Sequence, residues 1–144
     1  MALQNVIIDT DVYSALYTDP ERAARRGHPV TSWQDALAGS RVLISFQTRA
    51  EVLAGLRAGN WGGRRQQAAM AKLDAAPTIP ADREVLDSYA DLTALCRRAG
   101  HPLHDKIHTG DRWVAACAVA KGLPLLSGDG IYRGAPDDSL LVGG

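Results

Sequence analysis

The stretch Val6-Ile7-Ile8-Asp9-Thr10-Asp11-Val12 decides the fold of this chain. Its first half is continuous, apolar and β-branched, which predicts a short strand over 5–9 that is buried on both faces, as strands of parallel sheets are. Similar apolar runs predict further strands over 41–45 and 123–127. Two weaker candidates are 77–80, whose two prolines suit only a sheet edge, and 139–142.

Helical spacing fills the sequence between these strands. Caps, apolar periodicity and glycine stops predict helices over 11–17, 21–26, 31–37, 46–58, 63–75, 82–98 and 111–121. Strands that alternate with helices require crossover connections, which make the strands parallel. We therefore expect a single α/β domain over 1–144, with three layers (α/β/α) around a mainly parallel sheet of four to five short strands.

Composition excludes several classes of protein. At 144 residues the chain is long enough for one domain with its own core, and its 16 basic and 16 acidic residues cancel. A neutral chain has no overall attraction for nucleic acid, although a local basic patch would suffice. Cys96 and Cys117 have no metal-ligand spacing and suit buried, reduced thiols. We see no signal peptide and no membrane span, so we expect a soluble cytoplasmic protein.

Four acids follow the apolar runs or start the helices behind them: Asp9, Glu51, Asp111 and Asp129. In a parallel sheet these positions meet at the carboxyl ends of the strands, where ligands of such folds bind. Several carboxylates stay charged together only beside a cation, and hard oxygen ligands suit Mg²⁺ or Mn²⁺. Taken singly, each acid could instead cap a helix, form a turn or face solvent.

Four motifs around these acids resemble those of the PIN domain family. They are Val6 to Val12, Thr48-Arg49-Ala50-Glu51-Val52-Leu53-Ala54-Gly55, Asp111-Arg112-Trp113-Val114-Ala115-Ala116-Cys117-Ala118 and Gly122-Leu123-Pro124-Leu125-Leu126-Ser127-Gly128-Asp129. The resemblance spans nearly the whole chain in order and spacing. Ser127 stands where the family often has Thr, and Tyr132 where it often has Phe. A stand-alone domain of this size resembles the VapC-type ribonuclease toxins.

The resemblance implies a metal-dependent endoribonuclease that cleaves a structured RNA such as tRNA or rRNA. It also implies a cognate VapB-type antitoxin as partner and a homodimer. Asp9 and Asp111 would be the nearest metal ligands, with Glu51 and Asp129 completing the site directly or through water. The number of metal ions stays open. Thr10 and Ser127 could orient carboxylates, although ordinary cap or turn hydrogen bonds explain them equally well.

Basic side chains near the acids are candidates for holding RNA, because the acidic site itself repels phosphate. The candidates are Arg49, Arg57, Arg64, Arg65 and Arg112, with a second cluster at Arg22, Arg25 and Arg26. Each could equally be part of a solvated helix face. For the antitoxin contact we consider an apolar set that could equally be core: Trp33, Leu37, Val52 and Leu56.

Three other functions stay open. His104-Asp105-Lys106-Ile107-His108 echoes the zinc peptidase helix, in which two histidines four residues apart share a metal and a Glu acts as base; here an Asp replaces that Glu and no third ligand is evident. A binding module could keep the fold without the chemistry. A phosphatase could use the same acids on a smaller substrate.

Overall fold

The computed structural model describes residues 4–136 and 141–142 and contains one five-stranded sheet. The strands are β1 (Asn5–Ile8), β2 (Arg41–Ser45), β3 (Thr78–Ile79), β4 (Leu125–Leu126) and β5 (Leu141–Val142), in the order β3-β2-β1-β4-β5. All four pairings are parallel. The predicted parallel sheet is therefore confirmed, with the proline-flanked strand at an edge. Residues 139–140 of the predicted final strand lie outside the described residues.

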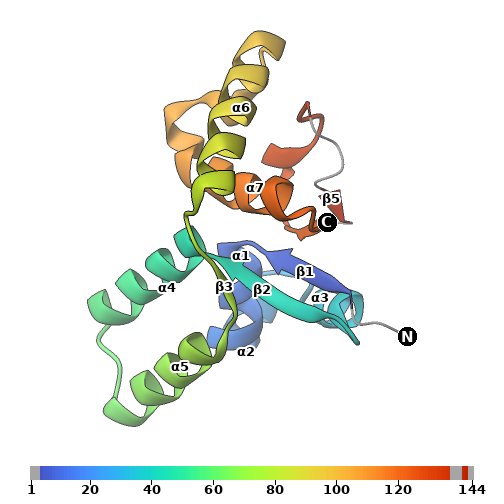
Figure 1. Ribbon diagram of the computed structural model, residues 1–144. Helices are drawn as coiled ribbons and strands as arrows, with labels where there is room; N and C mark the ends of the chain where they lie inside the picture. Colours follow the sequence, from blue (N-terminus) through green and yellow to red (C-terminus); the bar gives the residue numbers. More distant parts are fainter. Residues whose placement is uncertain (1–3, 137–140, 143–144) are drawn as a thin grey trace.

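The helices largely follow the predicted ranges (Figure 1). They are α1 (Thr10–Tyr13), α2 (Pro20–Arg25), α3 (Val30–Leu37), α4 (Phe46–Ala58), α5 (Gly63–Ala75), α6 (Arg83–Ala99) and α7 (Thr109–Lys121). One π-helical segment, η1 (Ser14–Thr18), and three 3₁₀ turns complete the set: η2 (Pro102–His104), η3 (Lys106–His108) and η4 (Gly130–Tyr132). The helix expected over 11–17 is thus divided into α1 and η1. Within the described ranges, no helix has both the length and the apolar character needed to cross a bilayer.

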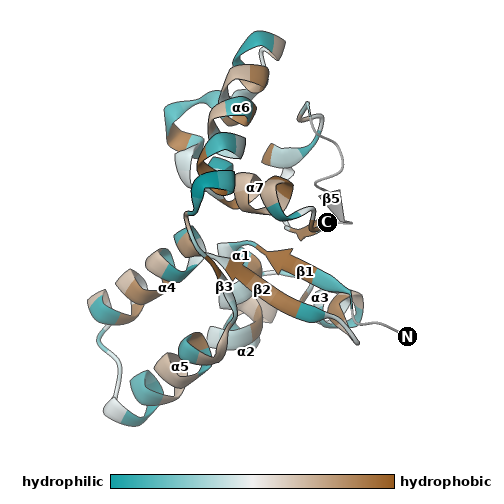
Figure 2. Ribbon diagram, viewed as in Figure 1, coloured by the Kyte–Doolittle hydropathy of each residue, from teal (hydrophilic) through white to brown (hydrophobic). Residues whose placement is uncertain are grey.

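The sheet separates two hydrophobic cores, which confirms the three-layer arrangement. One core contains Ile7 and Leu125 of the sheet and the inner faces of α6 and α7. The other contains Ile8 and Leu126 with residues from α1 to α5. Neighbouring residues of β1 and β4 thus point into opposite cores, which explains why these strands lack polar alternation. Figure 2 shows the same apolar character along β1 and β2.

The central strand β1 and its two neighbours fix the position of Asp9, the first residue of the candidate site. Ile8 of β1 pairs with Ile44 of β2 on one side and with Leu126 of β4 on the other. The backbone N–H of Asp9 continues this ladder by donating to the carbonyl of Leu126 at 3.3 Å. Asp9 and Ser127 are therefore brought together by strand register, at the carboxyl edge that the sequence indicates.

Candidate active site at the carboxyl edge of the sheet

Asp9 is the buried acid of the site. It follows β1 directly and caps α1, where its Oδ1 accepts a hydrogen bond from the backbone N–H of Val12 at 3.0 Å. Its other oxygen, Oδ2, accepts from the hydroxyl of Ser127, and the residue is only 5% exposed. Burial raises the pKa of Asp9 to about 6, although the hydrogen bonds from Ser127 and Val12 oppose that rise.

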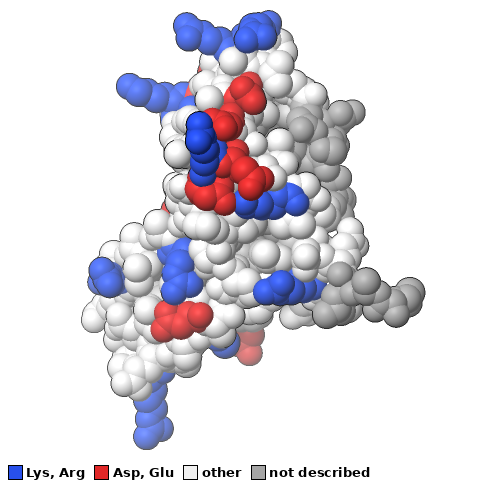
Figure 3. Space-filling model, in the orientation of Figure 1, with Lys and Arg blue, Asp and Glu red and all other residues white. Residues whose placement is uncertain are grey.

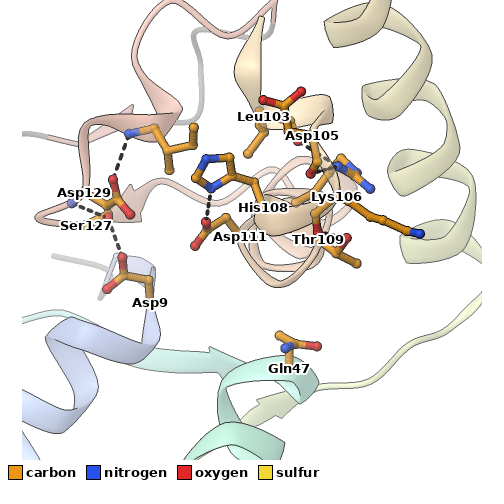
Figure 4. Close-up of polar contacts among 12 residues, drawn as sticks. Asp9, Gln47, Leu103, Asp105, Lys106, His108, Thr109, Asp111, Ser127 and Asp129 are labelled. Carbon is orange, nitrogen blue, oxygen red and sulfur yellow. Dashed lines mark hydrogen bonds and ion pairs between the residues drawn. The ribbon is translucent and has the colours of Figure 1, made fainter.

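Ser127 links Asp9 to Asp129 through its single hydroxyl. While it donates to Asp9, its Oγ accepts the backbone N–H of Asp129 at 2.9 Å. Asp129 is exposed, and its Oδ1 accepts from the backbone N–H of Ile131 at 3.0 Å (Figure 4). Gly128 between them lies against the indole of Trp33, to which an added Cβ would come within 2.7 Å. The loop after β4 is therefore tightly held.

Glu51 reaches the site from α4 and is exposed. Its carboxylate accepts from the hydroxyl of Thr10 and, at 3.0 Å, from the side-chain amide of Gln47. Thr10 Oγ1 lies 3.0 Å from Thr48 Oγ1, which in turn accepts from Ser45 Oγ at 3.3 Å. Since each hydroxyl donates once, the consistent direction runs from Ser45 through Thr48 and Thr10 to Glu51. We call these three hydroxyls the hydroxyl relay.

Asp111 is the third residue of α7 rather than its first, because the helix begins two residues earlier than predicted. Its Oδ2 lies 2.9 Å from Nδ1 of His108, one turn before it. Gly110 allows this helix start to approach α4, since an added Cβ would lie 3.1 Å from Glu51 Oε1 and 3.1 Å from Gln47 Nε2. The two helix-borne acids are thus brought together by a glycine.

Three of the four predicted acids line one pocket of about 180 Å³. Asp9, Glu51 and Asp111 share it with Thr10, Asp11, Gly110 and Val114. Asp129 does not line this pocket, although Figure 4 shows the Asp111 carboxylate turned toward the side where Asp9 and Asp129 lie. Burial raises the pKa of Asp111, and the charges of Asp129 and Glu51 add to that rise while His108 opposes it.

No Lys or Arg forms an ion pair with any of these four acids within the described part of the chain. Nor do three or more acidic, histidine or cysteine side chains of that part converge closely enough to hold a metal ion as they stand. The hydrogen bonds account for the spacing: Glu51 is held toward Gln47 and Thr10, and Asp111 toward His108. No Lys or Arg of the described residues therefore balances the charge of this acidic pocket, and its carboxylates lie apart from one another.

Tyr132 is a buried neighbour of the acids that sequence reasoning did not assign to the site. It is fully buried in η4, and its hydroxyl has no hydrogen-bond partner among the residues described. Burial raises its pKa, and the nearby charges of Asp111, Asp9 and Asp129 raise it further. The sequence gives one signal of this residue: Tyr132 stands where the family often has Phe. A Tyr there adds one hydroxyl to the hydrophobic core beside the acids. His108 ends η3 just before α7, three residues ahead of Asp111, and its side chain contacts that acid.

Two of the five arginines expected to hold RNA are withdrawn from solvent by structural partners, whereas Arg65, which pairs with Asp19, stays exposed. Arg112 is buried, and its guanidinium donates to the carbonyl of Leu103 at 2.7 Å and to the hydroxyl of Tyr89 at 2.8 Å. Arg49 is half-buried, and its guanidinium donates to the carbonyl of Leu73 at 2.9 Å and pairs with Asp74. We therefore leave both out of the proposed RNA-binding surface. The remaining candidates for RNA contact are exposed: Arg57, Arg64, Arg65, Arg22, Arg25 and Arg26.

Two further sequence interpretations need correction. The apolar set considered for the antitoxin contact is core, since every member is less than a tenth exposed and packs between the sheet and α1 to α5: Trp33, Leu37, Val52 and Leu56. The zinc alternative also fails, because His104 and His108 end separate 3₁₀ turns and do not share one helix. His104 Nδ1 lies 2.6 Å from the carbonyl of His101, while His108 Nδ1 faces Asp111.

Comparison with known proteins agrees with this geometry. A search of curated proteins by sequence found no match. The fold resembles the crystal structure of VapBC2 from Rickettsia felis bound to a promoter DNA fragment, with TM-score 0.73 and 16% identity over 97% of this chain and 98% of that one. It also resembles DNA-bound VapBC from Salmonella typhimurium, with TM-score 0.71 and 16% identity over 99% and 98%.

A third similar structure is FitAcB from Neisseria gonorrhoeae, with TM-score 0.68 and 23% identity over 96% of each chain. Likeness at such low identity establishes the fold alone. The family itself follows from the sequence, because residues 6–136 match the model of the PIN domain. That range includes all four acids and most of the chain. This chain belongs to the PIN domain family.

Proposed function

We propose that this protein is a metal-dependent endoribonuclease, the VapC-type toxin of a toxin–antitoxin pair. One observation carries the proposal: Asp9, Glu51 and Asp111 line one pocket, at the carboxyl edge of a PIN-domain sheet, and no Lys or Arg of the described residues pairs with them. Groups arranged for stability alone would have paired with Lys or Arg, since uncompensated acids repel one another. Such a pocket is suited to a cation and, through it, to a phosphodiester.

The chemistry of the pocket fits a hard divalent ion. The side chains that line it provide carboxylate and hydroxyl oxygens without sulfur or imidazole, which favours Mg²⁺ or Mn²⁺ over zinc. Asp9, Glu51 and Asp111 would hold the ion, with Asp129 beside them. Burial raises the pKa of Asp9 to about 6, so a bound cation would stabilise the ionised form that burial disfavours. A bound ion supplies Lewis acidity toward the phosphate and the attacking water.

The remaining polar groups act on the carboxylates. Ser127 donates to one oxygen of Asp9 while the backbone of Val12 donates to the other, which fixes the plane of that carboxylate. Thr10, the last hydroxyl of the relay, does the same for Glu51. Orienting groups of this kind reduce the freedom that metal ligands lose on binding. We assign Thr10 and Ser127 this positioning role.

RNA must be held outside the acidic pocket, because phosphate is repelled there. On the face shown in Figure 3, acidic side chains gather over α6, while Lys and Arg project from the ends of α4 and α5. The sequence places Arg57 at the end of α4 and Arg64 and Arg65 at the start of α5, all exposed. We propose these three as RNA contacts and α6 as a face that RNA avoids.

A VapB-type antitoxin and a second copy of this chain are the proposed protein partners, in the cytoplasm. The support is the fold shared with chains of VapBC complexes. Co-expression with a candidate VapB-type antitoxin, followed by size-exclusion chromatography with light scattering, would give the composition of the complex. The apolar core set described above is unavailable to such a partner because it is already packed inside the domain.

The test of the activity is cleavage of total cellular RNA by purified protein, with Mg²⁺, with Mn²⁺ and with chelator. We expect discrete fragments that require metal and are absent with Asp9→Asn, and end mapping would then identify the target RNA. An exposed acid in α3, Asp35, provides the matched control, and Asp35→Asn should cut like the unmodified protein. If folded protein freed of antitoxin cuts no RNA with either metal, a binding module becomes the better description.

A further inference from the structure

A second groove adjoins the acidic pocket. It has a volume of about 260 Å³ and lies between η1, α2 and the start of α5. Arg22, Arg26, His28 and Arg65 bring basic groups to its lining, and Trp61 provides an aromatic ring. Asp11 lines both this groove and the acidic pocket, so the two spaces are neighbours. A linear polymer bound along the groove would therefore pass Asp11 and extend toward the acidic pocket.

Of the two acids that line this groove, Asp11 and Asp19, the second is already neutralised. Asp19 caps α2, where its Oδ1 accepts the backbone N–H of Arg22 at 3.0 Å, and its Oδ2 pairs with Arg65 at 3.3 Å. The guanidinium groups of Arg22 and Arg26 form no ion pair within the described residues, and both side chains are exposed. Two unpaired arginines one helical turn apart are therefore available to an anion.

The indole of Trp61 lies close to the backbone at the end of α4. An added Cβ at Gly59 would lie 2.3 Å from Nε1 of Trp61, so only glycine lets the indole fold back over the end of α4. The guanidinium of Arg65 lies over the ring, 4.1 Å from its centroid. A planar cation stacked on a fixed indole forms a platform of the type on which nucleobases stack without regard to sequence.

We propose that this groove binds the RNA strand on one side of the cleaved bond. Arg22 and Arg26 contact backbone phosphates, and one base stacks on the Trp61–Arg65 pair. Asp11, between the two spaces, repels phosphate and so favours a path along the arginines. The inference rests on the proposed ribonuclease function and adds to it a strand-binding subsite that adjoins the pocket of the acids. It commits to RNA, because the groove joins unpaired arginines to a stacking platform.

The test measures binding apart from cleavage. A fluorescein-labelled, single-stranded 12-nucleotide RNA of mixed sequence is titrated with protein in chelator, and anisotropy gives Kd at several salt concentrations. We expect Arg22→Gln/Arg26→Gln to weaken binding about tenfold at 100 mM salt. The slope of log K against log salt should also fall by about 1.4, since each phosphate contact on a single strand contributes about 0.7.

The matched control is Arg97→Gln/Arg98→Gln, which removes two exposed arginines from the last turn of α6, outside the groove. It should leave both Kd and slope unchanged. Circular dichroism melts should show that both double variants stay folded. A second variant, Trp61→Ala, should weaken RNA binding without changing the salt slope, because stacking releases no counterions.

Unchanged affinity and slope in Arg22→Gln/Arg26→Gln would overturn the proposal. So would unchanged RNA binding together with tenfold weaker binding of a 20-residue Asp/Glu-rich peptide, which would make the groove a protein-docking site. The proposed function fails differently, in the absence of metal-dependent RNA cleavage by the unmodified protein. If that protein cuts RNA while the double variant binds RNA normally, the subsite alone is wrong.

Discussion

The candidate site has two halves that are built in different ways. The strand half, Asp9, Ser127 and Asp129, follows β1 and β4, and strand register places its members side by side. The helix half, Glu51, Gly110, Asp111 and His108, is carried by α4 and the start of α7. Asp9 is buried and doubly hydrogen-bonded, whereas Glu51 is exposed. Strand pairing therefore fixes the position of Asp9, whereas the position of Glu51 depends on how its helix packs against its neighbours.

The two halves also differ in the electrostatic cost of burying their carboxylates. Burying Asp9 without a counter-charge disfavours its ionised form, which is a cost that the fold bears for keeping the acid in place. The exposed Glu51 carries little of that cost. Variants of the strand half should therefore affect activity and stability together and strongly. Variants of the helix half should affect ligand geometry with smaller changes in stability.

The largest expected effect is the loss of RNA cleavage when Asp9 of the strand half is substituted. Asp9→Asn keeps the size of the side chain but removes the charge at the centre of the site, and we expect RNA cleavage to fall at least about a thousandfold. That loss would exceed the roughly 10–100-fold effect of residues that only orient metal ligands. Initial rates of cleavage with Mg²⁺ and Mn²⁺ would measure it. Residual activity within about tenfold of the unmodified protein would remove Asp9 from the metal site.

The same variant should be more stable in the absence of metal. The ordinary pKa of Asp9, 3.8, rises to about 6 in the folded state, so the folded protein binds more protons between these values. The free energy of unfolding therefore falls as pH rises from about 4 to 6, by up to about 3 kcal/mol. Asp9→Asn avoids this loss. Urea unfolding in chelator should show it more stable at pH 8 and similar near pH 4.

The control for this measurement is Asp35→Asn in α3, where the carboxyl is exposed and has no side-chain partner in the described structure. Its stability should follow that of the unmodified protein at every pH. The explanation by burial would be wrong if Asp9→Asn were no more stable at pH 8 than the control. Part of the gain is offset by Ser127, whose hydroxyl loses its carboxylate acceptor.

An intermediate effect is expected from the hydroxyl relay, which connects the core to the helix half. Thr48→Val removes the middle member, so Ser45 loses an acceptor and Thr10 loses a donor while the volume stays similar. We expect a loss of about 1–2 kcal/mol in the free energy of unfolding, because the O–H of the buried Ser45 is left without its acceptor. Thr93→Val is the control, since Thr93 bonds only to the carbonyl of Tyr89 in its own helix. Equal losses in the two variants would mean that the relay adds nothing.

A smaller effect should follow from loosening one ligand of the helix half. His108 holds Asp111 through a contact of 2.9 Å, so His108→Ala should leave that carboxylate free to rotate. We expect the affinity for Mn²⁺, measured by calorimetry, to fall about tenfold. His104→Ala is the matched control, because His104 contacts the carbonyl of His101 and the side chain of Asp105 rather than an acid of the site. Tighter Mn²⁺ binding in His108→Ala would show that the histidine competes with the metal.

The fold was largely predictable because local signals and tertiary structure agree along most of the chain. The strand over 41–45 and the helices over 46–58 and 63–75 have the bounds expected from apolar runs and glycine stops. The start of α7 was placed two residues late because Asp111 has the features of a cap, whereas the helix begins at Thr109 after η3. Boundaries set by a preceding turn leave little trace in local propensity.

The site was predictable where it depends on strand ends and not where it depends on distant partners. Residues after parallel strands must meet, which brings Asp9 beside Ser127. The burial of Arg112 depends on Tyr89, 23 residues earlier, and no local pattern of charge signals that contact. Arg49 is similar, since its partner Asp74 lies on the next helix. Charge patterns alone therefore do not show which arginines are free to contact RNA.

The smallest change in stability should come from the glycine that joins the two helix-borne acids. Gly110→Ala improves helix propensity by about 0.5–1 kcal/mol, but the new Cβ would lie 3.1 Å from Glu51 Oε1 and from Gln47 Nε2. Because both contacts are to ends of flexible side chains, we expect the terms nearly to cancel, while Glu51 moves away from the pocket. Gly63→Ala, at an open position that starts α5, is the control. Gly110→Ala should therefore cut RNA about tenfold more slowly than this control at nearly unchanged stability. Equal rates would show that cleavage tolerates a shift of Glu51 relative to Asp111, in contrast to the loss expected from Asp9→Asn in the strand half.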